Sequence, residues 1–284
     1  MMKTIRVGSR LLDLQRPVVM AIINVTPDSF FSGSRTQEAD AIERRVRQAV
    51  SEGAAILDVG GYSSRPGADD VSPREEFRRL ASALEIIRKK FPDTAVSIDT
   101  FRAGVMEKTL ENFGPCIVND ITGAEAEPEI AGVAARYRVP FIAMHMRGTP
   151  QNMQSRTHYD DLIGEIRGYF AAKTETLRSA GVEQIVLDPG FGFSKTVDQN
   201  FMLLGRMGET FRDTGLPFLA GISRKSMIYR TLDTTPDDAL TGTSALHWEC
   251  LRQGASILRV HDVREAAQVI ALWNRFTAAN TAKP

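Results

Sequence analysis

The stretch TAVSIDTFRAGVMEKTLENFGPCIVNDI, residues 94–121, shows the repeating pattern from which the fold can be predicted. Apolar runs at residues 95–99 and 116–119 end in Asp99 and Asn119, and an amphipathic segment separates them. Short apolar runs that alternate with amphipathic segments are typical of parallel strands covered by helices. This stretch therefore predicts one strand-helix-strand unit with polar side chains at its strand ends.

The same unit recurs along the whole chain. Local signals mark where helices begin, because Ser72 and Asp262 are each followed three residues later by glutamate, and Thr235-Pro236 opens a similar segment. Gly53 and Gly181 stand where a left-handed residue would end a helix. We expect strands at residues 18–24, 55–59, 95–99, 116–119, 140–144, 184–188, 217–222 and 255–260.

Eight strands are the number that closes a (β/α)8 barrel, also called a TIM barrel, with its site at the carboxyl ends of the strands. An open, doubly wound sheet shows the same alternation, but its ligand residues gather at one switch point. Here nearly every strand ends in a polar residue, which favours the barrel. These residues are Asn24, Asp58, Asp99, Asn119, His145, Asp188, Ser223 with Arg224 and Lys225, and Arg259 with His261. No linker divides the chain, so we expect one domain over residues 1–284.

Composition excludes several classes of protein. Lysine and arginine equal aspartate and glutamate at 35 each, so no net charge draws the chain to nucleic acid or to a membrane surface. No apolar run approaches the ~20 residues that span a bilayer. Cys116 and Cys250 lack metal-ligand spacing, and the N-terminus lacks an apolar signal segment. We expect a cytoplasmic protein without nucleic-acid or membrane partners.

The strand ends offer groups that recognise a planar ligand. Asp99, Asn119 and Asp188 each follow an apolar run, so in a barrel they would share one mouth. A carboxylate that faces two parallel N–H donors is a strong planar recognition element, and Lys225 could donate to a ring carbonyl. Taken singly, each of these residues could instead cap a helix or lie in solvent.

Other segments suggest a site for an anion. Residues 221–228, GISRKSMI, run from a strand into a helix start, where Arg224 and Ser226 could hold a phosphate or carboxylate. Arg259 and His261 are two residues apart and so lie on one side of a strand. Asn24 could supply an oxygen to magnesium, which takes few protein ligands beside substrate phosphates. No nucleotide-binding glycine motif is present.

Eight segments between residues 18 and 262 resemble, in order, the loop motifs of the dihydropteroate synthase family. They are NVTPDSF (24–30), GGYSSRPG (60–67), SIDT (97–100), NDI (119–121), MHMRGTP (144–150), LDPGFGFSK (187–195), GISRKS (221–226) and RVHD (259–262). The resemblance implies that a pterin methyl diphosphate is condensed with 4-aminobenzoate to give dihydropteroate and pyrophosphate in folate biosynthesis.

The resemblance also assigns residues to roles. It implies a pterin site of Asp99, Asn119, Asp188 and Lys225, lined by Met144 and Gly221. It implies a 4-aminobenzoate pocket, where sulfonamides compete, formed by Ser64, Arg65, Pro66, Phe193 and Ser226. It also implies a diphosphate site of Arg259 and His261 and a Mg²⁺ ligand, Asn24. Lys225, Asp99, Asp188, Arg259 and His261 are then the expected catalytic residues. The family also implies a cytoplasmic homodimer.

Two positions depart from the family pattern. Ser64 stands where threonine is usual, and Ser32 stands where aspartate is common. The second departure leaves open a catalytically silent, pterin-binding paralogue. A pterin-dependent methyltransferase is another alternative, since such enzymes use a similar barrel, but they need no lysine and arginine array for a diphosphate.

Overall fold

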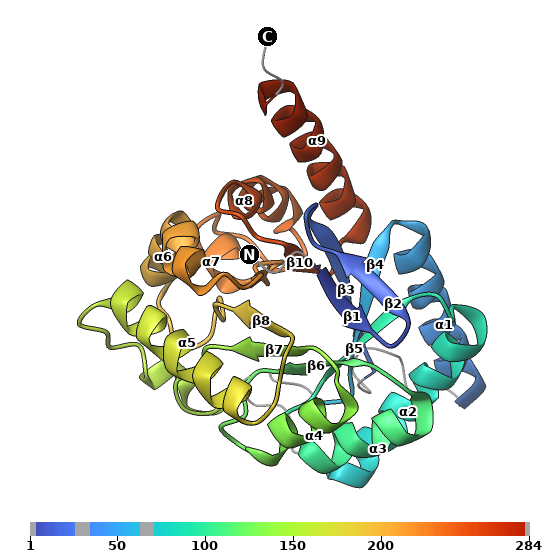
Figure 1. Cartoon of the computed structure of the whole chain (residues 1–284). Coiled ribbons are helices and arrows are strands. Elements are labelled where there is room, and N and C mark those ends of the chain that lie inside the picture. Colours follow the sequence, from blue (N-terminus) through green and yellow to red (C-terminus); the bar gives the residue numbers. More distant parts are fainter. Residues whose placement is uncertain (1–3, 26–34, 63–70, 282–284) are drawn as a thin grey trace.

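The structure is a barrel of eight parallel strands surrounded by helices (Figure 1). It is a computed structural model that describes residues 4–25, 35–62 and 71–281. The strands are β3 (Val18–Asn24), β4 (Ala54–Gly60), β5 (Ala95–Asp99), β6 (Ile117–Asp120), β7 (Phe141–Met144), β8 (Ile185–Asp188), β9 (Leu219–Ala220) and β10 (Ile257–Val260). Their order is β8-β7-β6-β5-β4-β3-β10-β9, and a parallel bridge between Leu187 and Phe218 closes the ring. The predicted barrel is confirmed, and the open sheet was wrong.

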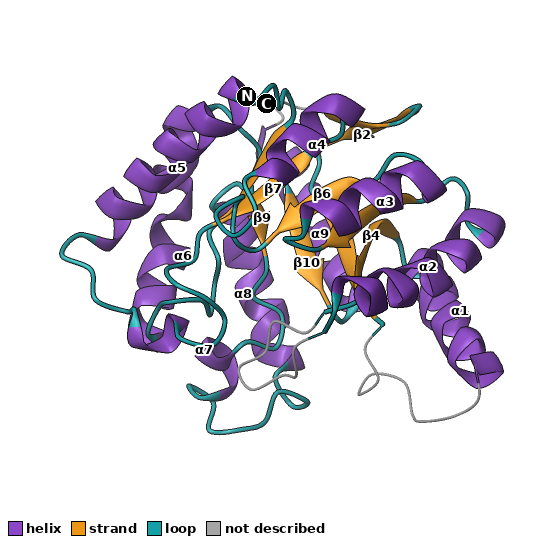
Figure 2. Cartoon of the chain, turned by 90° about the horizontal axis from the view of Figure 1, so that it is seen from below, coloured by secondary structure: helices purple, strands orange, loops and turns teal. Residues whose placement is uncertain are grey.

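Helices cover the outside of the barrel, and Figure 2 shows them around the strands. They are α1 (Arg35–Ser51), α2 (Pro73–Lys90), α3 (Ala103–Phe113), α4 (Glu129–Tyr137), α5 (Leu162–Ser179), α6 (Val197–Phe211), α7 (Ser226–Tyr229), α8 (Leu240–Arg252) and α9 (Val263–Thr281). Two short 3-10 turns also occur, η2 (Met153–Ser155) and η3 (Arg212–Thr214). No helix in the described ranges is both long and apolar enough to cross a membrane.

The expected helix signals fare unequally. Ser72 caps α2 by accepting a hydrogen bond from the Glu75 amide, and Gly53 and Gly181 have φ of 102° and 92°. The segment after Thr235 was wrong as a helix start, because the chain first makes turns and α8 begins only at Leu240. These turns explain the error, since a short polar run with proline also suits a turn.

A hairpin that was not predicted from the sequence precedes the barrel. β1 (Thr4–Val7) and β2 (Arg10–Asp13) pair antiparallel, and their apolar side chains join the barrel interior. The interior cluster takes one residue from every barrel strand: Met20, Ile56, Ala95, Ile117, Ile142, Val186, Leu219 and Ile257. Because the hairpin meets this layer from the amino ends of the strands, it plugs the bottom of the barrel.

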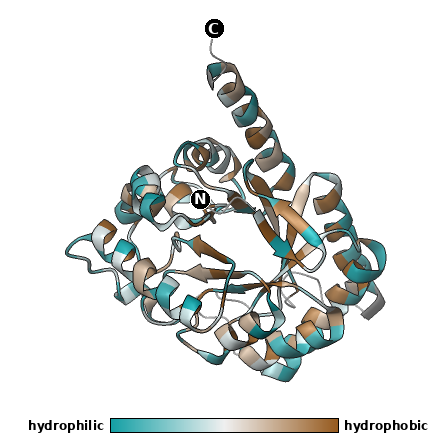
Figure 3. Ribbon diagram, in the orientation of Figure 1, coloured by the Kyte–Doolittle hydropathy of each residue, from teal (hydrophilic) through white to brown (hydrophobic). Residues whose placement is uncertain are grey.

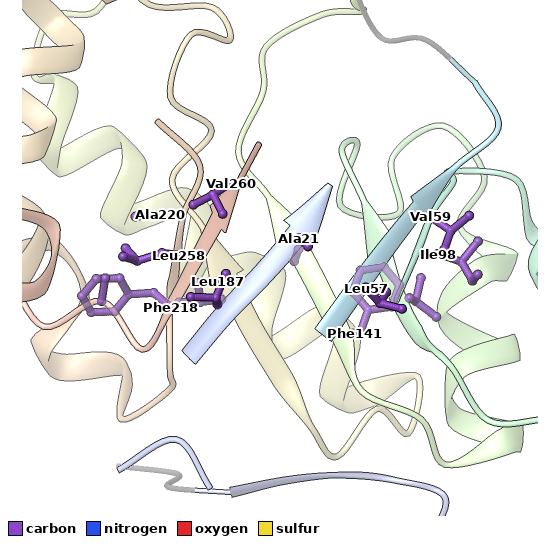
Figure 4. Packing of buried hydrophobic residues seen from close by; sticks show 14 of the residues in the cluster. Ala21, Leu57, Val59, Ile98, Phe141, Leu187, Phe218, Ala220, Leu258 and Val260 are labelled. Carbon is purple, nitrogen blue, oxygen red and sulfur yellow. The ribbon is translucent and has the colours of Figure 1, made fainter. Parts of the chain in front are cut away.

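The outward residues of the same strands form the main core beneath the helices. Figure 4 shows members of this cluster, among them Leu57, Ile98 and Leu258, and Figure 3 shows the strands as largely apolar and the helices as mixed. Side chains alternate between the two faces of a strand. The inward face therefore starts apolar at the bottom, and the next inward residues toward the mouth determine the chemistry.

Candidate active site at the barrel mouth

The middle inward layer of the barrel is polar. It comprises the residues two positions after each member of the apolar layer: Ile22, Asp58, Ser97, Asn119, Met144, Asp188, Gly221 and Arg259. Five of these eight carry polar or charged side chains, although most of them are buried. Buried polar groups are costly unless they are paired, so this layer points to a binding site.

Arg259 joins two carboxylates across the mouth. Its Nε donates to Asp58 Oδ2 and its Nη2 to Asp99 Oδ2, each at 2.7 Å. Asn119 Nδ2 donates to both oxygens of Asp58, at 3.2 and 3.1 Å. Asp58 was expected only as one of the strand-end residues, without a role, yet it is the centre of this cluster. Its inward position, two residues after Ile56, is the signal that could have found it.

The charges of this cluster depend on one another. Burial disfavours the charge of Arg259, but Asp58 and Asp99 outweigh that effect and raise the pKa of the guanidinium. Burial raises the pKa of Asp99 to about 7, with the attraction of Arg259 opposing it and the repulsion of Asp58 adding to it. The ion pair with Arg259 therefore offsets part of the cost of burying the Asp99 carboxylate.

Asp188 and Lys225 form the opposite side of the mouth. Asp188 Oδ1 accepts a hydrogen bond of 2.8 Å from the Gly190 amide. Burial raises the pKa of Asp188, and Lys225 and the Gly190 amide oppose the rise. Burial lowers the pKa of Lys225 to about 8, so its ammonium form still predominates at pH 7. Lys225 Nζ donates to the Phe191 carbonyl oxygen and lies 4.5 Å from the centre of the Phe193 ring.

An apolar wall accompanies these charges. Met144 and Phe193, both predicted to line the site, pack in one cluster together with Ile121, Met146 and Met153. Gly221 leaves space beside Arg259, because a Cβ there would lie 4.0 Å from Arg259 Cβ. A flat apolar wall beside paired carboxylates and a lysine suits an aromatic heterocycle that carries hydrogen-bonding groups at its edge.

His261 lies beside the mouth and bonds to a neighbouring strand end. Ser223 Oγ is 3.1 Å from His261 Nδ1, and the His261 amide donates to the same oxygen at 3.2 Å. Burial and, to a lesser extent, the charge of Arg259 together lower the pKa of His261 to about 4, so the imidazole is neutral at pH 7. A neutral imidazole can contact an anion only by donating an N–H.

Arg224 already has a carboxylate partner in the folded chain. Its guanidinium pairs with Asp262 through Nε and Nη2, at 2.9 and 2.8 Å, and so joins the last two loops of the barrel. α7, which begins at Ser226, is a single turn, so its dipole is small. Ser226 is partly buried after Lys225. Asp262, in the next loop of the barrel, therefore neutralises Arg224 in this structure, and the expectation that Arg224 holds an anion stays a prediction.

One further expectation was wrong because the residue lies on the other face of its strand, and another concerns residues that the structure does not describe. His145 was expected in the ring of polar residues, but it follows Met144 and so lies on the outward face, where it contacts Lys195 at 3.0 Å. Ser64, Arg65 and Pro66 lie outside the described residues, as does Ser32.

Asn24 and Asp99 both direct a side-chain oxygen toward Gly60 at the mouth. A Cβ placed on Gly60 would lie 3.8 Å from both Asn24 Oδ1 and Asp99 Oδ2. Within residues 4–25, 35–62 and 71–281 there is no group of three or more His, Cys, Asp or Glu side chains able to hold a metal ion. An amide and a carboxylate oxygen fit magnesium better than zinc, because magnesium keeps several waters and prefers oxygen ligands.

Comparison with known proteins is consistent with this geometry. A family described as pterin binding enzyme matches residues 20–261. The dihydropteroate synthase of Synechocystis is 45% identical over 275 residues, which are 94% of each chain. The chain is also similar to the crystal structure of Yersinia pestis dihydropteroate synthase in a sulfonamide drug complex (TM-score 0.90, 37% identity, 97% and 99% of the two chains). Xanthomonas albilineans dihydropteroate synthase with 4-aminobenzoic acid gives a TM-score of 0.89 at 32% identity, over 99% of both chains.

Proposed function

The chain belongs to the dihydropteroate synthase family of pterin-binding enzymes, and we propose from this premise that it is a transferase that makes dihydropteroate for folate synthesis. Its substrates are 7,8-dihydropterin-6-ylmethyl diphosphate and 4-aminobenzoate. The observation that carries the proposal is the mouth itself, where Asp188 and Lys225 face the Asp58–Arg259–Asp99 cluster beside an apolar wall.

The pterin binds with its polar edge toward the charged residues. Asp188 accepts from the amino and ring N–H groups, and Lys225 donates to the ring oxygen, a pairing that suits a planar edge. Asn119 and Asp99 bind the other hydrogen-bonding groups of the ring, and Met144 and Phe193 contact its faces. Because these groups are held by buried bonds before the ligand arrives, little ordering is needed on binding.

The reaction is a substitution at the pterin methylene carbon. The amine nitrogen of 4-aminobenzoate forms a bond to this carbon, the carbon–oxygen bond breaks, and its electron pair leaves with pyrophosphate. The amine releases a proton to solvent. Arg259 and the N–H of neutral His261 stabilise the negative charge that develops on the leaving group. Ser226, Ser64, Arg65 and Pro66 shape the 4-aminobenzoate site together with Phe193, and sulfonamides compete there.

Asn24 is the protein ligand proposed for Mg²⁺, and the nearby carboxylate of Asp99 would add negative charge beside the ion. The ion would supply positive charge to the diphosphate oxygens when bound. Asn24→Ala should therefore raise the magnesium concentration needed for pyrophosphate binding, which calorimetry measures without turnover.

We also propose that the protein is a cytoplasmic homodimer with one domain. Leu272 and Phe276 on α9 are 65% and 52% exposed, and this helix extends away from the barrel in Figure 1. Trp248 and Trp273 pack beside Phe276 and widen the apolar surface. Two reduced, buried cysteines support a reducing compartment. Sedimentation of the wild type and of Phe276→Asp tests the dimer, since the variant should be monomeric.

One assay tests the proposed activity. Pyrophosphate release from the pterin diphosphate should require 4-aminobenzoate, and Lys225→Met should abolish it. Release at the same rate without 4-aminobenzoate would show a hydrolase. Pterin binding without any release would show a silent paralogue.

A further inference from the structure

Lys195 is a buried lysine that the proposed reaction does not use. Its side chain is 3% exposed, and Nζ lies 3.0 Å from each of three acceptors: the Gly190 carbonyl, the Phe193 carbonyl and His145 Nδ1. An ammonium group has three N–H donors. Within the described residues no carboxylate contacts Nζ, and burial lowers the pKa of Lys195 to about 7, so the three acceptors bind its ammonium form below that pH without an ion pair.

This arrangement also sets the state of His145. Burial lowers the pKa of His145 well below its usual value, and the charge of Lys195 lowers it further. The imidazole is therefore neutral, and Nδ1 is the acceptor when Lys195 is charged, so the ring proton resides on Nε2. Rings of Tyr169 and Phe170 hold the imidazole, with centroids 4.8 and 6.3 Å away.

The two carbonyls that Lys195 binds belong to a tightly folded loop, residues 190–194. Gly190, Gly192 and Ser194 have φ of 68°, 80° and 48°, and the last of these is a strained value for a residue with a Cβ. A Cβ on Gly190 would lie 2.0 Å from the His145 carbonyl oxygen, so only glycine fits there. Such a loop keeps its shape only if surrounding bonds hold it, and Lys195 supplies two of them.

The opposite side of the same loop contacts the pterin residues. The Gly190 amide donates to Asp188, and the Phe191 carbonyl accepts from Lys225. The Phe193 ring lies under Lys225 Nζ, and a Cβ on Gly192 would be 3.0 Å from Lys225 Cδ. The loop thus fixes the direction of both Asp188 and Lys225.

We propose that Lys195, which contacts His145, is a positioning residue for the pterin site. Lys195 holds the 190–194 loop in the conformation in which Asp188 and Lys225 point at the ligand. The inference rests on the pterin-binding function proposed above. Lys195 also contributes positive charge toward Asp188, in addition to Lys225 and Arg259, and so favours the carboxylate that the pterin needs. The charged and titratable groups that act on Lys195 itself are Asp188, Lys225, Arg147 and His145.

The test is calorimetric binding of 6-hydroxymethylpterin, which lacks the diphosphate, to five proteins. They are the wild type, Lys195→Met, His145→Leu, the double variant of these two residues, and the control Lys108→Met, an exposed lysine on α3 whose amine lies 4.3 Å from the centre of the Phe77 ring. We expect Lys195→Met to bind at least ten-fold more weakly, His145→Leu to be intermediate, and Lys108→Met to match the wild type. The double variant of Lys195 and His145 should bind like Lys195→Met alone, because both changes remove one unit.

The pH dependence of pterin affinity distinguishes a loss of positioning and of positive charge near Asp188 from a loss of loop structure alone. In Lys195→Met the loss of pterin affinity at low pH should begin at a higher pH than in the wild type, because Asp188 has lost a nearby cation. Asp99 is present in both proteins, so its titration does not contribute to this difference. If Lys195→Met does not fold, His145→Leu must show the weakened binding. Affinity within three-fold of wild type, in either folded variant, overturns the inference. A wild type that does not bind the pterin overturns the proposed function instead.

Discussion

Arg259 on β10 and Asp99 on β5 are joined by a 2.7 Å ion pair although two strands, β3 and β4, separate their strands in the sheet. The pair therefore spans the mouth of the barrel. Since Arg259 also binds Asp58, one cation compensates two carboxylates that lie inside the barrel. The ion pairs of Arg259 with Asp58 and Asp99 place charged groups at the mouth, where a ligand can bind. They also link strands that are not neighbours in the sheet.

Removing this cation should destabilise the protein. Arg259→Met leaves two inward carboxylates without compensation, and breaking a buried pair in this way costs about 3–5 kcal/mol. Asp58→Asn in the same chain should restore part of the loss, because it removes one of the two charges. Urea denaturation of the wild type, the single and the double variant measures this. Additive losses in the double variant would show that the two residues do not compensate each other.

Asp188 should contribute most of the pterin affinity. Asp188→Asn removes an acceptor from a planar, charge-assisted pair and should cost about 2–5 kcal/mol of binding free energy. Asp198→Asn is the matched control. Asp198 is exposed at the start of α6, so its substitution should leave the pterin affinity unchanged. The measurement is calorimetry with a pterin that lacks the diphosphate. An Asp188→Asn protein that binds within three-fold of the wild type would refute the assignment.

Much of this site could be predicted because strand ends obey a simple geometry. Each of Asp99, Asn119 and Asp188 follows an apolar run, and parallel strands bring such residues to one mouth. His145 also follows an apolar run, yet one residue of register places it on the outward face. Counting by two from the apolar inner layer would have excluded His145 and included Asp58.

Partners from distant loops could not be predicted in the same way. Arg224 is neutralised by Asp262, which lies 38 residues later, and no local pattern marks that pairing. Lys195 looks like a surface residue in a sequence, because lysine is seldom buried, and its three acceptors come from the folded loop and from β7's end. The β1–β2 hairpin was missed because its strands, TIRV and RLLD, are half polar and form no continuous apolar run.

Stability should fall in mild acid because of a buried histidine on α8. His247 is 1% exposed, neither ring nitrogen has a partner among the described residues, and burial lowers its pKa to about 4. Its unfolded pKa is about 6.5, so the unfolded state binds the proton first as the pH falls. Stability is therefore complete above pH 6.5 and declines toward pH 4, by up to about 3 kcal/mol.

The variant His247→Leu isolates this effect. His145 and His261 titrate in both proteins, so the difference in unfolding free energy between them reports on His247 alone. We expect the difference to favour the variant increasingly from pH 7 to pH 4.5. A constant difference over that range would mean that His247 takes up its proton at the same pH in the folded and unfolded proteins, so that burial does not lower its pKa.

The hairpin that plugs the bottom of the barrel should be necessary for stability rather than for pterin recognition. Leu12 on β2 is 5% exposed and packs with Met20 and Ile257 in the inner layer, whereas its neighbour Leu11 is 55% exposed. The pair forms a matched experiment, since both substitutions remove the same atoms from the same strand. Leu12→Ala should cost about 2–5 kcal/mol of unfolding free energy, because it opens a cavity among buried side chains. Leu11→Ala should change stability by less than about 0.5 kcal/mol.

Both variants should keep wild-type pterin affinity at a temperature where they are folded, because the polar layer lies above the plug. Equal losses in the two variants would show that the hairpin does not seal the barrel, and weakened pterin binding in folded Leu12→Ala would show that the plug supports the site directly.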